Sequence, residues 1–411
     1  MALLLSSLIG RATSILIFMD EVQKNHLKAY GLAFWSLKKQ AEVDWLLNYR
    51  GGSFLVKYNK DVESECKVRG VSYEVLPDGA VTRLLNEISD PQANMEMVKL
   101  EKAPKVAVYS PKSKLPWDDA VTLVLTYAEI PYDIIYDDDI LKDKLTAYDW
   151  LHLHHEDFTG QYGRFYSTFN FATWYIEDVK QQEAAAKRNG FSKVSEMKLA
   201  VAKTIKQFCA GGGFLFAMCS GTDSFDIALA AEGVDIVERM FDGDPADPQA
   251  QSKLDYSKSV AFTDFRLDQN PLHYEFSDID VTDTRRLTQA DDFFTLFDFS
   301  AKWDIVPTML TQNHEKVIKG FMGQTTAFRK KLVKPDITVL GENKGAGEVR
   351  YLHGSAGKGQ FTFYGGHDPE DYQHKVNDPP TDLNLHPNSP GYRLILNNVL
   401  FPAAKKKPQK T

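Results

Sequence analysis

The sequence predicts an α/β protein, a three-layer sandwich with a mainly parallel sheet and an inserted segment of strands and loops. Short apolar runs alternate with segments of helical spacing along most of the chain, which is typical of a parallel sheet covered by helices. This alternation stops after residue 238 and has resumed by Glu348. Residues 211–233 read as a strand, a sharp turn and a helix. A chain of 411 residues with 43% hydrophobic content can bury the large core that this fold requires.

The first elements follow one another as strand, helix and strand. Residues 15–19 are an apolar run, residues 26–39 carry apolar side chains at helical spacing, and residues 43–49 return to strand character. A turn at residues 50–53 leads to another strand at 54–56. We interpret this order as a β-α-β unit, so the parallel sheet is predicted to open at residue 15.

The alternation continues after a polar segment at residues 57–104, in which we expect one helix around residues 81–88. Three elements of alternating type follow: a strand at 105–109, a helix at 117–129 and a strand at 132–136.

The next strand carries histidines and ends in polar residues. Residues 148–158 read YDWLHLHHEDF, and alternation places His152 and His154 on one face of the strand. Three polar residues follow at its end and are predicted to line a site: His155, Glu156 and Asp157. Imidazoles and carboxylates this close can bind Zn²⁺, so His152 and His154 are weak candidates for metal ligands. Because adjacent strand residues point to opposite faces, His154 and His155 are not expected to share a metal.

Residues 211–233 predict a nucleophile elbow. An apolar strand at 214–218 ends at Cys219, and a helical pattern begins after Ser220 and Gly221. The helix N-terminus would lower the pKa of a thiol at this turn. The alternative is that Cys219 is an ordinary core residue, because cysteine is among the most buried residue types.

A second loop far along the chain can complete a catalytic site. A strand at 360–364 ends in two glycines, and His367, Asp368 and Glu370 come directly after them. A histidine with a carboxylate close behind it can supply a base for the thiol and the group that orients that base. We therefore predict that Cys219 and His367 lie side by side at the ends of neighbouring strands.

Together, the two loops resemble those of the class I glutamine amidotransferase-like fold, in which the elbow reads G-x-C-x-G and the second loop reads H-P-E. The Gly-Gly-His ending is similar to that of the trehalose-utilisation-type relatives of this fold. The resemblance implies a flavodoxin-like sheet with Cys219 as the nucleophile and His367 as the base. Glu370 would orient the imidazole, with Asp368 as its competitor, and N–H groups near Ser220, Gly221 and Asp157 would hold an oxyanion. It implies a hydrolase that acts on an amide or related carbonyl.

Two other functions remain open. Residues 220–224, SGTDS, are similar to the S-G-G-x-D-S pyrophosphate loop of asparagine synthetase, and the chain resembles bacterial proteins named asparagine synthetase B. That resemblance implies an ATP-dependent amide ligase. Thr222 stands where the second glycine of the motif would be, so we predict that this loop does not bind pyrophosphate. The third possibility is a non-catalytic ligand-binding module on the same fold.

Composition restricts the partners. The formal net charge of −8 argues against a nucleic-acid-binding protein, which would carry a basic stripe. The three cysteines form no C-x-x-C metal pair, and no stretch approaches the ~20 apolar residues of a membrane span. We therefore expect a small-molecule substrate, no cofactor and no integral membrane segment, whereas the oligomeric state is left open.

The domain boundaries follow from the same patterns. Residues 1–14 combine an apolar run with small residues, which favours an export signal and a periplasmic location over a cytoplasmic N-terminal arm. The main α/β domain is predicted at residues 15–238 and 340–402, with an insertion or cap at 239–339 between its two parts. Residues 403–411 form a basic tail.

Overall fold

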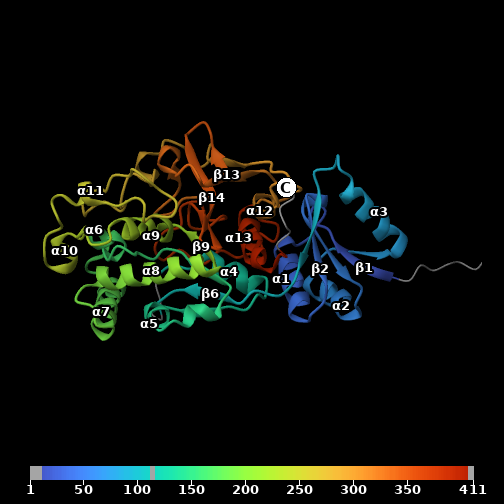
Figure 1. Cartoon of the computed structure of the whole chain (residues 1–411), viewed down its shortest axis with the longest axis horizontal. Coiled ribbons are helices and arrows are strands. Elements are labelled where there is room, and N and C mark those ends of the chain that lie inside the picture. Colours follow the sequence, from blue (N-terminus) through green and yellow to red (C-terminus); the bar gives the residue numbers. More distant parts are fainter. Residues whose placement is uncertain (1–11, 112–115, 406–411) are drawn as a thin grey trace, which may run out of the picture.

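The computed structural model describes residues 12–111 and 116–405, and it shows an α/β fold with two sheets (Figure 1). The expected export signal at 1–14 and the basic tail at 403–411 fall mostly outside these residues. Among the described residues, no helix has both the length and the apolar composition needed to cross a bilayer.

The N-terminal region forms a five-stranded sheet of its own, in the order β4-β1-β3-β2-β5. All its strand pairs are antiparallel, with Leu16 opposite Leu55 in the β1–β3 pair. The predicted parallel opening is therefore wrong. Only residues 48–52 separate β2 from β3, too few for the crossover of a dozen or more residues that a parallel pair needs. The elements are β1 (Ala12–Ile17), α1 (His26–Lys38), β2 (Val43–Leu47), β3 (Ser53–Lys57), α2 (Lys60–Arg69), β4 (Glu74–Pro77), α3 (Asp78–Ser89) and β5 (Glu96–Leu100).

The second sheet has ten strands and is mixed. Its main path runs β11-β10-β13-β14-β15-β9-β8-β6-β7, and β12 pairs with β14. The strands from β15 to β7 are parallel to one another, as the alternation predicts for this part of the chain. They are β6 (Val106–Tyr109), β7 (Asp133–Ile135), β8 (Trp150–Leu153), β9 (Phe214–Met218) and β15 (Gly359–Tyr364).

The segment at 239–339 supplies strands to the antiparallel edge of this sheet. Its strands β10 (Phe293–Leu296) and β11 (Val317–Lys319) extend the sheet beyond β13, and β12 (Phe328–Arg329) pairs with β14. Strand β14 (Glu348–Ala356) forms an antiparallel hairpin with β15. The remaining elements here are α10 (Arg239–Asp242), α11 (Ala250–Lys253), α12 (Ile305–Leu310) and β13 (Thr338–Asn343).

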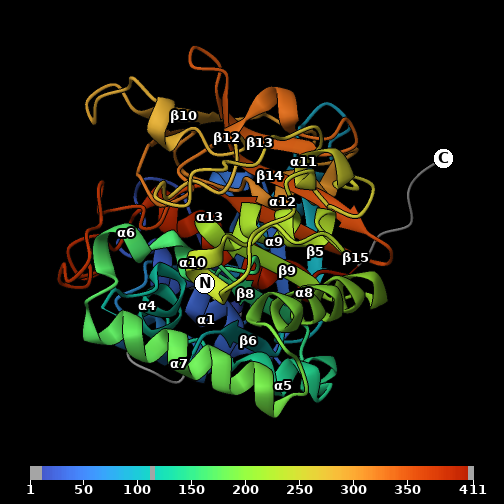
Figure 2. The ribbon, with the colours of Figure 1, turned by 90° about the vertical axis from the view of Figure 1, so that its left-hand side faces the viewer.

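Helices cover both faces of the parallel strands. Along β9, Leu215 and Ala217 belong to one buried cluster, whereas Phe216 and Met218 belong to another. The first cluster includes residues of α8 (Val194–Gly211) and α9 (Ser220–Ala230); the second includes residues of α4 (Ala120–Tyr127) and α13 (Pro390–Leu400). Helix α7 (Thr173–Arg188) packs beside α8 (Figure 2). The short α5 (Asp137–Leu141) and α6 (Tyr166–Phe169) complete the helices.

Candidate functional site

The candidate site lies where three parallel strands end. Leu153 of β8 is opposite Ala217 of β9, and Met218 of β9 is opposite Tyr364 of β15. The loops that begin at His154, Cys219 and Gly365 are therefore neighbours at the carboxyl edge of the sheet. The prediction that Cys219 and His367 follow neighbouring strands is confirmed.

The backbone at Cys219 has the strained conformation of an elbow. Its φ of 50° and ψ of −142° are unusual for a residue with a side chain, and α9 begins at the next residue. The Gly221 N–H donates to the His154 carbonyl oxygen at 2.5 Å, and a side-chain carbon at Gly221 would overlap that oxygen. The Gly221 N–H is thus already used and does not hold an oxyanion as predicted.

The Cys219 thiol is enclosed. Cys219 is 2% exposed. Burial raises the pKa of its thiol to about 11, although the backbone N–H groups of Thr325, Ser220 and Gln324 oppose this rise. The expectation of an easily ionised thiol is therefore contradicted, because desolvation outweighs the helix N-terminus. Burial also raises the pKa of the two other thiols, Cys66 and Cys209, to about 12.

The loop at residues 321–326 contacts both the thiol and the backbone of the predicted base. Met322 accepts a hydrogen bond from the His367 N–H at 2.9 Å, and Thr325 accepts one from the Gly366 N–H at 2.8 Å. The same loop presents N–H groups to the sulfur. In the described part of the chain, no hydrogen bond joins Cys219 to the His367 ring, whose buried Nε2 has no hydrogen-bond partner. The predicted dyad is not assembled.

The two predicted orienting acids make their contacts within their own loop instead of orienting the His367 ring. Asp368 is fully buried and accepts hydrogen bonds from the Glu370 N–H at 2.9 Å and the Thr381 hydroxyl at 2.8 Å. Glu370 pairs with His386, with 3.1 Å between Oε2 and Nδ1.

His367 instead belongs to a cluster of imidazoles. Its ring centroid lies 4.3 Å from that of His154, 5.6 Å from that of His155 and 4.0 Å from that of His374. The rings of His154 and His155 are 4.8 Å apart, contrary to the expectation that they diverge. Strand β8 ends at Leu153, so strict alternation does not extend to His155. Sequence reasoning missed His374, for which the only signal was its place in the same loop as His367.

Three carboxylates surround these rings. Asp119 Oδ2 lies 3.3 Å from His152 Nε2 and 3.4 Å from His154 Nδ1. Asp118 Oδ1 lies 3.2 Å from His374 Nε2, and Asp371 Oδ2 lies 3.0 Å from His374 Nδ1. Nothing in the sequence marked Asp118 and Asp119 as site residues. An aspartate in the position of Asp119 is an ordinary helix N-cap, and Asp119 does cap α4.

Burial favours the uncharged form of three of these rings. It lowers the pKa of His152, and with the neighbouring imidazoles it lowers the pKa of His155 and His367 well below the usual range. Burial opposes ionisation of Asp119, yet His152 and His154 hold the pKa of that carboxyl well below its usual range. Neutral imidazole is the form that binds metals.

Three buried nitrogens in this cluster make no hydrogen bond and face no carboxylate: Nε2 of His154, Nδ1 of His155 and Nε2 of His367. Ligand atoms from these three residues lie within 4.8 Å of one another. Two overlapping groups share the same spacing, Asp118 with His367 and His374, and Asp119 with His152 and His154. Buried polar atoms without partners are rare in folded proteins, so their concentration here points to a bound group.

The remaining predicted site residues face elsewhere or support loops. Glu156 accepts a hydrogen bond from the Tyr136 hydroxyl at 3.2 Å, and burial raises its pKa to about 8. Asp157 accepts hydrogen bonds from the N–H groups of Gln161 at 2.7 Å and Gly163 at 3.1 Å. Ser220 is fully buried, and its hydroxyl makes no hydrogen bond.

The loop similar to a pyrophosphate loop is closed on itself. Residues 220–224 form the first turn of α9 and are buried. The Thr222 hydroxyl donates to the Cys219 carbonyl at 2.6 Å, and the Ser224 hydroxyl donates to the Ser220 carbonyl at 2.6 Å. These contacts favour our expectation that the loop does not cradle a phosphate.

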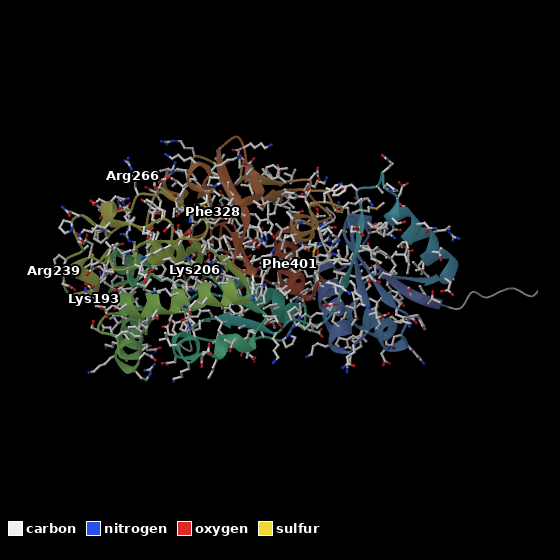
Figure 3. All side chains as sticks on the ribbon, in the orientation of Figure 1. Lys193, Lys206, Arg239, Arg266, Phe328 and Phe401 are labelled. Carbon is white, nitrogen blue, oxygen red and sulfur yellow. The ribbon has the colours of Figure 1, made fainter. Side chains whose placement is uncertain are left out.

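Another carboxylate group holds a lysine. Asp235, Asp242 and Asp244 are close enough to bind a cation, and Lys193 Nζ lies 2.7 Å, 2.9 Å and 2.7 Å from them. Lys193 lies at the end of the molecule far from the N-terminal sheet (Figure 3). Its ammonium group supplies the positive charge that these carboxylates need.

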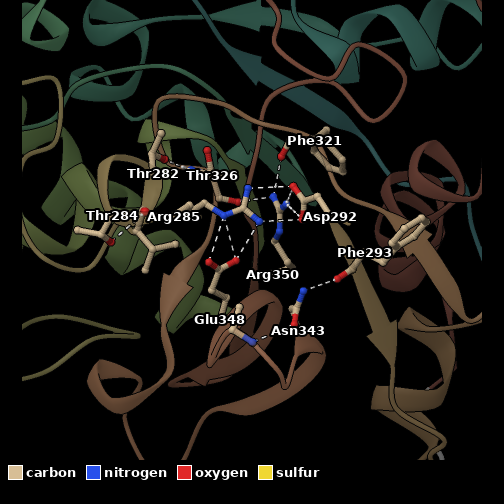
Figure 4. A network of polar contacts seen from close by, with 12 residues as sticks. Thr282, Thr284, Arg285, Asp292, Phe293, Phe321, Thr326, Asn343, Glu348 and Arg350 are labelled. Atoms are coloured by element: carbon tan, nitrogen blue, oxygen red, sulfur yellow. Dashed lines mark hydrogen bonds and ion pairs between the residues drawn. The ribbon is translucent and has the colours of Figure 1, made fainter. Parts of the chain in front are cut away.

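A buried ion network anchors the loop at residues 321–326 (Figure 4). The Arg350 guanidinium donates to the carbonyl oxygens of Phe321 and Thr326, both at 2.6 Å, and pairs with Asp292 at 2.7 Å. Arg285 also pairs with Asp292 and with Glu348, at 2.7 Å and 3.0 Å. Both ends of the 321–326 loop are thus fixed by one side chain.

Comparisons with known proteins give remote structural matches. No family model matches the chain, and no curated protein matches it. Among solved structures, the cytoplasmic proteins STM3548 and STM1381 from Salmonella typhimurium match 74% and 73% of this chain and all of their own, at 10% and 11% identity and TM-scores of 0.35 and 0.37. Gan42B, a GH42 β-galactosidase, matches 64% of this chain and 27% of its own at 14% identity and a TM-score of 0.28. At these scores, the matches assign neither a family nor a function.

Proposed function

We propose that this chain is a metal-dependent hydrolase that holds a divalent transition metal of the Zn²⁺ type with His154, His155 and His367. The observation that carries the proposal is the set of buried ring nitrogens without partners in these three residues. Three histidines are a common ligand set of catalytic zinc, and they leave a fourth position open for water or substrate.

The choice of ligands follows from what each ring already contacts. His374 faces a carboxylate at each nitrogen, Asp118 at 3.2 Å and Asp371 at 3.0 Å. His154 has a carboxylate only near Nδ1, which leaves Nε2 for a metal. A carboxylate on the far nitrogen of a metal-bound histidine is a recurrent arrangement that fixes the ring and strengthens the ligand.

The chemistry suited to this arrangement is hydrolysis of an amide or a related carbonyl. A metal at the site would lower the pKa of bound water to about 7 and polarise the carbonyl oxygen. Water would add to the carbonyl carbon, the bond to nitrogen would break, and the amine would leave with a proton. Asp118, whose carboxylate lies within 4.8 Å of a ring nitrogen of His367, would accept the water proton, because burial raises the pKa of its carboxyl although His374 opposes this rise.

The scaffold that we propose is a class I glutamine amidotransferase-like domain. Its support is the run of parallel strands from β15 to β7 together with the elbow conformation of Cys219. On this scaffold, the metal group would replace the usual dyad.

A second candidate is catalysis by Cys219. It is favoured by the strained elbow, since such a conformation costs of order 1–3 kcal/mol and clusters at active sites. For the thiol to act, the 321–326 loop would have to move away from it. A ligase that uses residues 220–224, and a module that binds without catalysis, remain further possibilities.

Metal binding by the purified full chain is the decisive test. We expect one Zn²⁺ per chain by mass spectrometry of metals, and a loss in affinity of more than about 100-fold in His367→Ala. Asp119→Asn keeps a helix N-cap but removes the charge near His154, so we expect a loss of 10- to 100-fold. His273→Ala, at an exposed histidine outside the cluster, is the matched control and should bind as the unchanged chain does. Absence of metal, or equal affinity in all variants, would overturn the proposal.

A further inference from the structure

We infer that the substrate of this centre carries a flat apolar group next to the oxygen that binds the metal. The inference rests on the proposed function and names the substrate class. It comes from four aromatic side chains that we call the aromatic wall, namely Trp117, Phe165, Phe169 and Trp174.

The aromatic wall adjoins the most accessible of the proposed ligands. The Trp117 ring lies 5.2 Å from the His155 ring at an interplanar angle of 85°. Phe165 and Trp174 lie 5.2 Å and 5.1 Å from Trp117, and Phe169 lies 5.2 Å from Trp174. His155 is half-buried, whereas His154 and His367 are buried, so we expect a substrate to approach from the side of His155 and the wall.

The wall is not a sealed part of the core. All four of its side chains are half-buried, although Tyr162 and Tyr175, which are close to three of them in sequence, are only 5% exposed. Adjoining aromatic rings that remain partly exposed beside a polar site are typical of ligand-binding surfaces.

Trp117 also has an unused hydrogen-bond donor. Its indole Nε1 is buried and makes no hydrogen bond, although a buried tryptophan N–H usually finds a partner. Trp117 directly precedes Asp118, the proposed proton acceptor. A substrate with a ring against Trp117 and an acceptor oxygen near the indole would satisfy this donor while its carbonyl reaches the metal.

Two hydroxamates serve as probes, because they share a metal-binding group and differ in one substituent. Benzohydroxamate carries a phenyl ring and acetohydroxamate carries a methyl group. We expect the Zn²⁺-loaded full chain to bind benzohydroxamate about tenfold more tightly, as one aromatic contact and its buried area allow. In Trp117→Leu, that ratio should fall toward the value set by general hydrophobicity, whereas acetohydroxamate affinity stays unchanged. Trp303→Leu, at a tryptophan that is 74% exposed, is the control and should keep the tenfold ratio.

Each outcome separates the two proposals. If the chain takes up no metal, the proposed function fails and the inference falls with it. If metal binds but both probes bind equally, or if Trp117→Leu weakens both probes alike, the inference alone is overturned. Should Trp117→Leu not fold, Trp174→Leu removes a neighbouring ring of the wall and is expected to lower the same ratio.

Discussion

The elbow at Cys219 and the histidine cluster lie at the ends of adjacent strands, yet their polar groups differ in what they contact. The Cys219 sulfur accepts hydrogen bonds from backbone N–H groups and is enclosed by the 321–326 loop. The helical turn that follows Cys219 is closed by the hydrogen bonds of Thr222 and Ser224. His154 and His367 are also buried and His155 is half-buried, but a ring nitrogen of each has no partner. The difference teaches that an intrinsically reactive side chain marks a site less reliably than buried polar atoms left without partners.

Gly221 links the elbow to the histidine cluster, because its N–H donates to the His154 carbonyl oxygen. Its substitution should therefore have the largest effect on stability. In Gly221→Ala the added carbon would overlap the His154 carbonyl oxygen, which is backbone and cannot move aside easily. We expect a loss of about 3 kcal/mol or more in the free energy of unfolding, measured by urea denaturation. Gly211→Ala is the control, because nothing lies within 4 Å of its added carbon, and it should change stability by less than about 0.5 kcal/mol. A mild effect in Gly221→Ala would mean that the two regions are not rigidly coupled.

Alkylation of Cys219 tests directly whether its thiol is enclosed and protonated. With a pKa of about 11, the thiol carries little thiolate at pH 7.5, so iodoacetamide should modify it at least about tenfold more slowly than free cysteine. Peptide mass spectrometry gives the rate, and the same measurement in denaturant should show all three cysteines reacting readily. Cys219→Ala should leave metal stoichiometry unchanged. Labelling as fast as that of free cysteine would contradict the enclosure of the Cys219 thiol and favour the thiol as the catalytic group.

Glu156 provides the smallest of the three effects and a pH dependence. Burial raises the pKa of its carboxyl from 4.5 to about 8, so the folded chain keeps a proton that the unfolded chain releases. The stability contributed by this group is complete below pH 4.5 and is lost as the pH rises through about 8. Glu156→Gln should therefore raise the free energy of unfolding at pH 8 by on the order of 1 kcal/mol, with little change at pH 4.5.

The control for Glu156 is Glu101→Gln, at an exposed residue, which should show no such pH dependence. Because Glu156 bonds to Tyr136 and not to the histidines, Glu156→Gln should also leave metal affinity unchanged. Equal stability curves for the two variants would show that Glu156 is ionised in the folded chain.

The parallel half of the fold could be predicted from sequence because each strand and helix there is a separate local pattern. The N-terminal sheet could not, since the apolar runs at 15–19 and 43–49 look the same whether their strands pair parallel or antiparallel. The short β2–β3 connection decides the matter, and it was visible only as a turn.

The candidate site shows the same division between local and distant information. The pattern at residues 214–221 predicted the elbow backbone, but the surroundings of its thiol are set by residues 321–326, about a hundred positions later. His152 and His154 could be placed on one face because strand alternation is local. The meeting of His367 and His374 with Asp118 depends on two loops far apart in the sequence, which no local period encodes.

The ion network under the 321–326 loop has a consequence for acid tolerance. Arginine stays protonated in proteins, and Arg285 and Arg350 hold the pKa of Asp292 below its usual range despite its burial. None of these groups changes charge as the surroundings become mildly acidic. The contacts that Arg350 makes with Asp292 and with the 321–326 loop are therefore expected to persist in mild acid.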